Sequence, residues 1–96
     1  MTFASVYNTR ETAVFEAVAA HAPRYPGIAD EPALLADVAC VALNRMPAQY
    51  ICHSTDLAFF STERERKATR RHIDESVDFA FGYVQARHLM AARRQS

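Results

Sequence analysis

Two cysteines and a neighbouring histidine, Cys40, Cys52 and His53, are the side chains most suited to metal binding or nucleophilic catalysis. A structural zinc site needs four ligands, usually from close pairs such as C-x-x-C or H-x-x-x-H, and the chain has neither pair. A cysteine beside a histidine in sequence also differs from a cysteine whose thiol is aimed at one, and no third orienting group is indicated. We therefore expect no metal site, and interpret Cys40 as a buried thiol in a helix core.

Carboxylate pairs could supply a general acid and a general base. Asp74, Glu75 and Asp78 lie close together in sequence, but beside basic residues such as Arg71, which is typical of a solvated helix face. The chain also has no glycine-rich phosphate loop. An enzyme is therefore not expected, and no cofactor is implied.

A basic cluster lies between Ser61 and His72, where Glu63 and Glu65 are outnumbered by basic residues: Arg64, Arg66, Lys67, Arg70 and Arg71. Cations in the first turns of a helix oppose its macrodipole, and a bound anion relieves that repulsion. The alternative is a solvated charged face with ion pairs such as Glu63 to Lys67. The sequence leaves both interpretations open.

Length and composition indicate one small globular domain that spans residues 1–96. Half of the residues are hydrophobic, and 11 basic residues balance 11 acidic ones, so no overall charge attracts nucleic acid or an anionic membrane. Two cysteines are too few for a disulfide framework. The N-terminus lacks the features of a signal peptide, and no stretch is apolar enough to cross a bilayer. We expect a cytoplasmic protein that contacts neither membrane nor nucleic acid.

Capping signals and prolines delimit two N-terminal helices. Asn8 with Glu11 has the form of a capping box and Pro23 ends the run, which predicts a helix at about residues 8–22. Asp30 is the expected N-cap of a second helix, which Pro47 ends near residues 44–45.

A third helix is predicted at about residues 62–92, starting from a capping box at Thr62–Glu65. The connection from Ala48 to Phe60 has no helical period, and a short strand is possible at Tyr50–Cys52. The fold class is therefore all-α, with three main helices. The expected core follows the helical spacing of apolar residues: Tyr7, Val14, Phe15, Val18, Ala22, Leu34, Leu35, Val38, Val41, Ala42, Ile73, Val77, Ala80, Phe81, Val84 and His88.

The third helix is long for so small a domain. About 30 residues make a rod of roughly 45 Å, whereas a compact domain of this size has a radius of gyration near 13 Å. A second apolar stripe, on a different face, adds Phe79, Tyr83, Ala86 and Met90. A homodimer through this helix is the expected way to bury that stripe. The alternative is that the first two helices cover both faces within one chain.

The stretch "DVACVALNRMPAQY", residues 37–50, resembles the signature D-V-x-A-L-A-L-N-x-L-P-P-x-Y of the late competence development protein family, the ComFB-like domains. "VYNTRETAV" is similar to that family's N-terminal helix start, and "ARH" at 86–88 to the basic close of its last helix. The resemblance implies a small helical homodimer, and some members are receptors for cyclic-di-GMP or cyclic-di-AMP. Some also bind zinc through cysteines, where this chain has Glu31 and Leu34.

A cyclic dinucleotide presents two phosphates and two purine faces, which arginines, lysines and aromatic rings recognise. From this chemistry we assign Arg45 to a phosphate or a guanine, Tyr50 to base stacking and Gln49 to a base edge. Phosphate neutralisation is assigned to Arg64, Arg66 and Lys67. Tyr50 is equally well a half-buried aromatic, and Arg45 a cation at a helix C-terminus.

These inferences predict a non-enzymatic receptor that relays a cyclic dinucleotide signal to a protein partner, such as a transcription factor, in bacterial signalling or competence. The prediction requires the arginines beside Pro47 and those opening the third helix to converge in space. The alternative is an adaptor dimer without a small ligand, whose apolar helix faces bind another protein.

Overall fold

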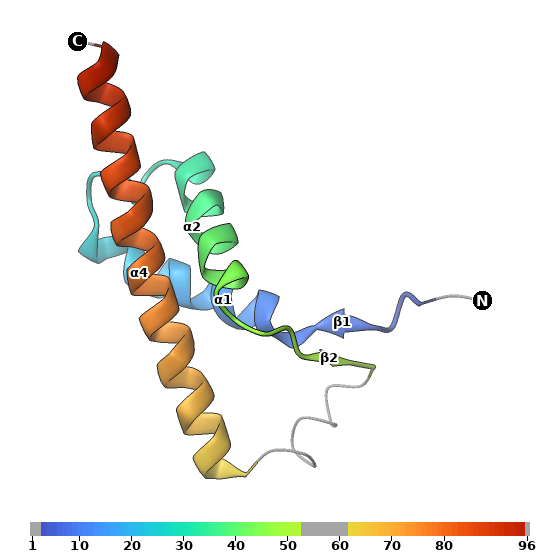
Figure 1. Ribbon diagram of the computed structural model, residues 1–96. Coiled ribbons are helices and arrows are strands. Elements are labelled where there is room, and N and C mark those ends of the chain that lie inside the picture. Colours follow the sequence, from blue (N-terminus) through green and yellow to red (C-terminus); the bar gives the residue numbers. More distant parts are fainter. Residues whose placement is uncertain (1–2, 53–61, 96) are drawn as a thin grey trace.

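The computed structural model describes residues 3–52 and 62–95. In chain order the elements are β1 (Tyr7–Asn8), α1 (Thr9–His21), the short 3-10 helix η1 (Ala22–Arg24), α2 (Pro32–Asn44), β2 (Tyr50–Ile51) and α4 (Glu63–Gln95). Figure 1 shows α1 and α2 packed across the middle of the long α4, with the strand pair projecting to one side. The mostly helical class with a long C-terminal helix is confirmed.

Asn8 starts α1 as predicted. Its side-chain oxygen accepts a hydrogen bond from the backbone N–H of Arg10 at 3.1 Å, which satisfies one of the unpaired amides at the helix start. The helix ends at His21, because Pro23 lies in η1, which follows directly. Both ends of α1 lie within one residue of the prediction.

The predicted N-cap of α2 was wrong. Glu31, rather than Asp30, occupies the capping position, with φ −112° and ψ 98°, and its side chain makes no capping hydrogen bond. Pro32 is the first helical residue, and a proline restricts the residue before it to extended geometry. The helix therefore begins at the proline, two residues after the expected cap.

The capping box at the start of α4 is present. The backbone N–H of Glu65 donates to the hydroxyl of Thr62 at 3.1 Å, and the N–H of Thr62 donates to the carboxylate of Glu65 at 3.4 Å. The helix runs for 33 residues, which corresponds to about 50 Å. It accounts for the longest dimension of the chain, 53 Å, and extends past α1 and α2 at both ends (Figure 1).

The hydrophobic core lies where the three helices meet. Phe81 of α4 is fully buried, and its ring stacks on Tyr25 with centroids 4.4 Å apart and an interplanar angle of 2°. Ile28, in the connection from η1 to α2, is also buried. The helix residues of the core are largely those predicted: Val14, Val18, Ala22, Val38, Ala39, Ala42, Ile73, Val77, Ala80, Phe81 and Val84.

Four residues expected in the core lie at the surface. Phe15 is 53% exposed, Tyr7 39%, and both Cys40 and His88 are exposed. With only three helices, α1 and α2 each bury one narrow face, and a residue one position from that face is turned by about 100° away from it. Phe15 next to Val14, and Cys40 next to Ala39, lie at such positions.

The predicted strand exists and has a partner that was not predicted. β1 and β2 pair antiparallel, with Tyr7 opposite Ile51 and Asn8 opposite Tyr50. This pairing holds the connection after α2 against the start of α1. Within the described part of the chain, no helix has both the length and the hydropathy that a bilayer crossing requires.

Candidate functional site

Gln49 is held against the start of α1 by hydrogen bonds to Asn8 and Thr9. Its backbone N–H donates to the side-chain oxygen of Asn8 at 3.0 Å, and its carbonyl accepts from the N–H of Thr9 at 2.7 Å. The hydroxyl of Thr9 lies 3.0 Å from the same carbonyl and 2.9 Å from the side-chain oxygen of Gln49. The residues around the proline break therefore hold a fixed position beside the first turn of α1.

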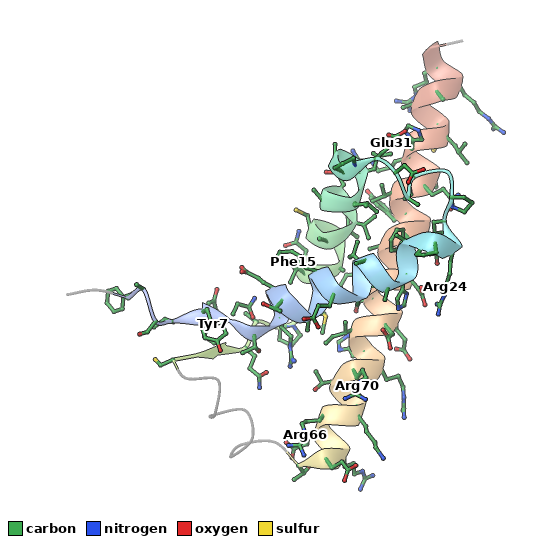
Figure 2. All side chains as sticks on the ribbon, turned by 180° about the vertical axis from the view of Figure 1, so that it is seen from behind. Tyr7, Phe15, Arg24, Glu31, Arg66 and Arg70 are labelled. Atoms are coloured by element: carbon green, nitrogen blue, oxygen red, sulfur yellow. The ribbon has the colours of Figure 1, made fainter. Side chains whose placement is uncertain are left out.

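Gln49 lies at one edge of a groove of about 520 Å³ between α1 and the first half of α4. We call this hollow the charged groove, because three arginines line it: Arg10 from α1, and Arg66 and Arg70 from α4. Figure 2 labels Arg66 and Arg70 on the part of α4 that extends below α1. Arginine recognises phosphates and guanine edges through paired N–H donors, so three of them in one groove can bind an anionic ligand.

Arg10 is the most enclosed of these arginines. Its Nε is buried and has no hydrogen-bond partner among the described residues, and burial lowers the pKa of its guanidinium. A buried donor without a partner destabilises the fold unless a ligand or water accepts its hydrogen bond. Arg10 therefore lines the charged groove with a guanidinium whose hydrogen-bonding capacity the described residues do not fully satisfy.

Two carboxylates, Glu16 and Asp74, also line the charged groove. Asp74 contacts His21, which is buried at the end of α1: the imidazole Nε2 lies 3.1 Å from one oxygen of Asp74. The other ring nitrogen, Nδ1, lies 2.7 Å from a carboxylate oxygen of Asp78. Both ring nitrogens of His21 therefore lie within hydrogen-bond distance of a carboxylate on α4, one on each side of the imidazole.

Asp78 also contacts two residues at the end of η1 and thereby links η1 to α4. The hydroxyl of Tyr25 donates to it at 3.3 Å, and a guanidinium nitrogen of Arg24 lies 3.8 Å away. Burial and the nearby Asp78 carboxylate raise the pKa of the Tyr25 phenol. Asp74 and Asp78 therefore anchor α1 and η1, a role that was not predicted, while their side chains remain 49% and 43% exposed on the helix face that the sequence predicted to be solvated.

The six residues assigned from sequence do not meet at one place. Gln49 and Arg66 line the charged groove, whereas Arg64 and Lys67 line a separate hollow on α4, together with Arg71. The Nζ of Lys67 lies 3.7 Å from a carboxylate oxygen of Glu63, which is the ion pair that the sequence offered as an alternative.

The two remaining residues lie elsewhere. The guanidinium carbon of Arg45 lies 3.8 Å from the ring centroid of Phe79 on α4, and Tyr50 is 65% exposed on β2. The convergence of Arg45 with the arginines that open the last helix, which the receptor prediction required, does not occur within one chain. Three residues that were not assigned, Arg10, Arg70 and Asp74, complete the charged groove instead.

The missed residues left only a weak signal in the sequence. Arg70 and Asp74, which were missed, follow the assigned Arg66 at successive intervals of four residues, so the three share one face of a helix. Arg10 follows the Asn8 cap directly, but which face of α1 meets α4 cannot be read from that position. Their meeting with Gln49 depends on the packing of α1 against α4.

A second groove lies on the other side of α1, against α2. We call it the apolar groove, because its lining consists of apolar residues and one cysteine, and it has a volume of about 560 Å³. Phe15 and Cys40 belong to it, which explains why neither is buried in the core.

The metal ligands weighed from the sequence are not assembled in the described residues. Cys40 and Cys52 are exposed free cysteines, and His53 lies outside the described residues. Within residues 3–52 and 62–95, no group of three or more histidine, cysteine or acidic side chains could hold a metal ion.

Comparison with known proteins gives one match, which is to a protein family. No curated protein and no solved structure matches the chain significantly. The model of the family described as Late competence development protein ComFB matches residues 7–88, a span that includes α1, α2, the charged groove and most of α4. The chain therefore belongs to the ComFB late competence development family.

Proposed function

We propose that this protein is a non-enzymatic receptor that binds a cyclic dinucleotide, cyclic-di-GMP or cyclic-di-AMP, in the charged groove. The observation that carries the proposal is the meeting of Arg10, Arg66 and Arg70, from two helices far apart in sequence, at one hollow. Arg10 adds a buried donor without a partner among the described residues. Such a set of donors fits a ligand with two phosphates and two base edges.

The volume of the charged groove and its uncharged lining residues also fit a cyclic dinucleotide. Its volume of about 520 Å³ lies within the range of small-molecule sites, about 300–1,000 Å³. Gln49 offers an amide that can both donate to and accept from a base edge, and its hydrogen bonds to Asn8 and Thr9 hold it in place. Ala13, Ala17 and Ile73 supply an apolar surface against which a base can lie.

Isothermal titration calorimetry with each of the two nucleotides tests the proposal. Arg10→Ala combined with Arg70→Ala removes two guanidinium groups from the charged groove. We expect both affinities to fall by about 100-fold or more, because each charged hydrogen bond contributes about 1.5–3 kcal/mol and two are lost. The matched control is Arg64→Ala with Arg71→Ala, which removes the same charge from the separate hollow on α4. Equal losses of nucleotide affinity in the two double variants would show that binding depends on net charge and not on the charged groove.

We also propose that the receptor is a homodimer formed through α4. Phe79 and Tyr83 are each 46% exposed and Met90 is 54% exposed, along the second stripe predicted from sequence. A second copy would bury these side chains and the overhanging end of the helix. Sedimentation should give a dimer for the natural chain and a monomer for Tyr83→Glu, with Phe15→Glu, on α1, as the matched control. Monomeric behaviour of the natural chain contradicts this arrangement.

The second candidate function is an adaptor that binds a protein through the apolar groove. It is favoured by the exposure of Phe15 beside Cys40 in a hollow without charged lining residues. The calorimetry separates the two candidates, since an adaptor without a small ligand takes up neither nucleotide.

A further inference from the structure

Neutralisation of phosphate alone does not account for the carboxylate of Asp74 in the lining of the charged groove. It lines the charged groove together with three arginines, and a carboxylate there repels phosphate oxygens. Its presence is explained if the ligand carries hydrogen-bond donors as well as negative charge, because an ionised carboxylate only accepts hydrogen bonds.

The carboxylate of Asp74 is held in place but remains accessible. One of its oxygens lies 3.1 Å from Nε2 of His21, whose Nδ1 contacts Asp78 at 2.7 Å, so the imidazole is fixed from both sides. The side chain of Asp74 is nevertheless 49% exposed. It can therefore accept hydrogen bonds from a ligand in a preset orientation, which lowers the entropy lost on binding.

Arg70 lies one helical turn before Asp74 and lines the same groove. A guanidinium next to a carboxylate matches guanine, whose O6 and N7 accept hydrogen bonds while its N1–H and amino group donate them. On the corresponding edge, adenine has only its amino group as a donor. Its N1 is a hydrogen-bond acceptor and therefore repels a carboxylate oxygen, which is also an acceptor.

We propose that Asp74, positioned by His21 and paired with Arg70, makes the charged groove selective for guanine over adenine in a cyclic dinucleotide. This inference rests on the proposed function and adds the identity of the base. Arg10 and Arg66 then serve the phosphates, which the two nucleotides share.

Calorimetry of the full chain with cyclic-di-GMP and cyclic-di-AMP measures the selectivity directly. We expect the natural chain to bind the guanine nucleotide more tightly by roughly tenfold to 100-fold, as for one bidentate base contact. Asp74→Asn should bring the ratio close to one, chiefly by weakening cyclic-di-GMP. The matched control is Asp78→Asn, which changes the other carboxylate bound to His21; among the described residues, Asp78 is not part of the groove lining.

Each outcome supports or overturns a specific statement. Equal binding of the two nucleotides by the natural chain, or a preference for adenine, overturns the selectivity and leaves the proposed receptor function standing. Equal shifts of the ratio in the two variants show that Asp74 acts only by holding His21, which also overturns the inference. Uptake of neither nucleotide overturns the receptor function and the inference together. The ratio in the natural chain tests the preference for guanine even if a variant fails to fold, and an unchanged ratio in a folded Asp74→Asn variant overturns the role of Asp74.

Discussion

The charged groove and the apolar groove share α1 as a common wall and have similar volumes, about 520 and 560 Å³, yet their chemistry is opposite. One side of α1 contributes Arg10 and Glu16 to the charged groove. Another side contributes Phe15 and Ala19 to the apolar groove. Val14, fully buried, faces the core that separates them. A single short helix thus serves two sites of different kinds.

The difference follows from which helix completes each groove. The charged groove is completed by the first turns of α4, which are rich in arginine, and the apolar groove by α2, whose lining residues are Leu35, Ala36, Ala39, Cys40 and Leu43. Substitutions on α1 can therefore separate the proposed ligand binding in the charged groove from the proposed protein binding in the apolar groove.

The largest effect should come from the core that supports both grooves. Phe81→Ala removes a fully buried ring and its stack on Tyr25, and we expect a loss of about 3–5 kcal/mol in the free energy of unfolding. Urea denaturation at fixed protein concentration measures it, because the proposed dimerisation would make stability depend on concentration. Phe3→Ala, at a residue 70% exposed, is the control. Similar losses in the free energy of unfolding for Phe81→Ala and Phe3→Ala would contradict the placement of Phe81 in the core.

A smaller effect should be confined to the charged groove. Asn8→Ala removes the cap of α1 and the contact to the N–H of Gln49, and we expect a loss of about 0.5–2 kcal/mol. Nucleotide affinity should fall as well, because Gln49 loses one of its anchors. Thr12→Ala, at an exposed position on α1, serves as the control for denaturation and calorimetry. Unchanged stability in the Asn8 variant would mean that the cap contributes nothing.

The contacts of η1 with α4 predict a change of stability with pH. Burial and Asp78 raise the pKa of Tyr25, so folding favours the neutral phenol. The contribution of the neutral Tyr25 phenol to the free energy of unfolding is present below the ordinary tyrosine pKa of about 10. It is lost as the pH rises through the higher pKa of the folded state. Tyr25→Phe should therefore lose less stability than the natural chain between about pH 8 and pH 11.

Urea midpoints at several pH values across that range test the prediction. Tyr50→Phe is the comparison, since Tyr50 is 65% exposed and should follow the natural chain. Parallel curves for all three proteins would rule out a role for the Tyr25 phenol in alkaline unfolding.

The smallest effect is expected in the apolar groove. Phe15→Ser should change the free energy of unfolding by less than about 1 kcal/mol, because the ring is 53% exposed and its loss leaves no buried cavity. Nucleotide affinity should stay the same, since Phe15 lies outside the charged groove. A large fall in affinity would mean that the two grooves are coupled through α1. Alanine at the same position repeats the test without adding a hydroxyl.

The sequence by itself determined the elements and most of the core. Asn8, Pro23, Pro47 and the Thr62–Glu65 capping box act through nearest neighbours along the chain, so the helix ends they set could be predicted to within a few residues. The 3.6-residue period likewise identified Val14, Val38 and Val77 as core residues. The motifs around Asn8 and Asn44 also carried the resemblance to the family that the comparison confirmed.

The site was decided only by the tertiary structure. The sequence indicated a basic start of the last helix, but Arg66 and Arg70 lie on a different face from Arg64 and Lys67, and only the packing of α1 selects between them. Asp74 contacts His21 and shares the charged groove with Arg10, and each of these two pairs is separated by more than 50 positions of sequence. The local spacing of apolar residues determines which face of each helix is buried. Contacts between polar residues far apart in sequence depend instead on how the helices pack against one another. That is why the helices could be predicted from the sequence and the charged groove could not.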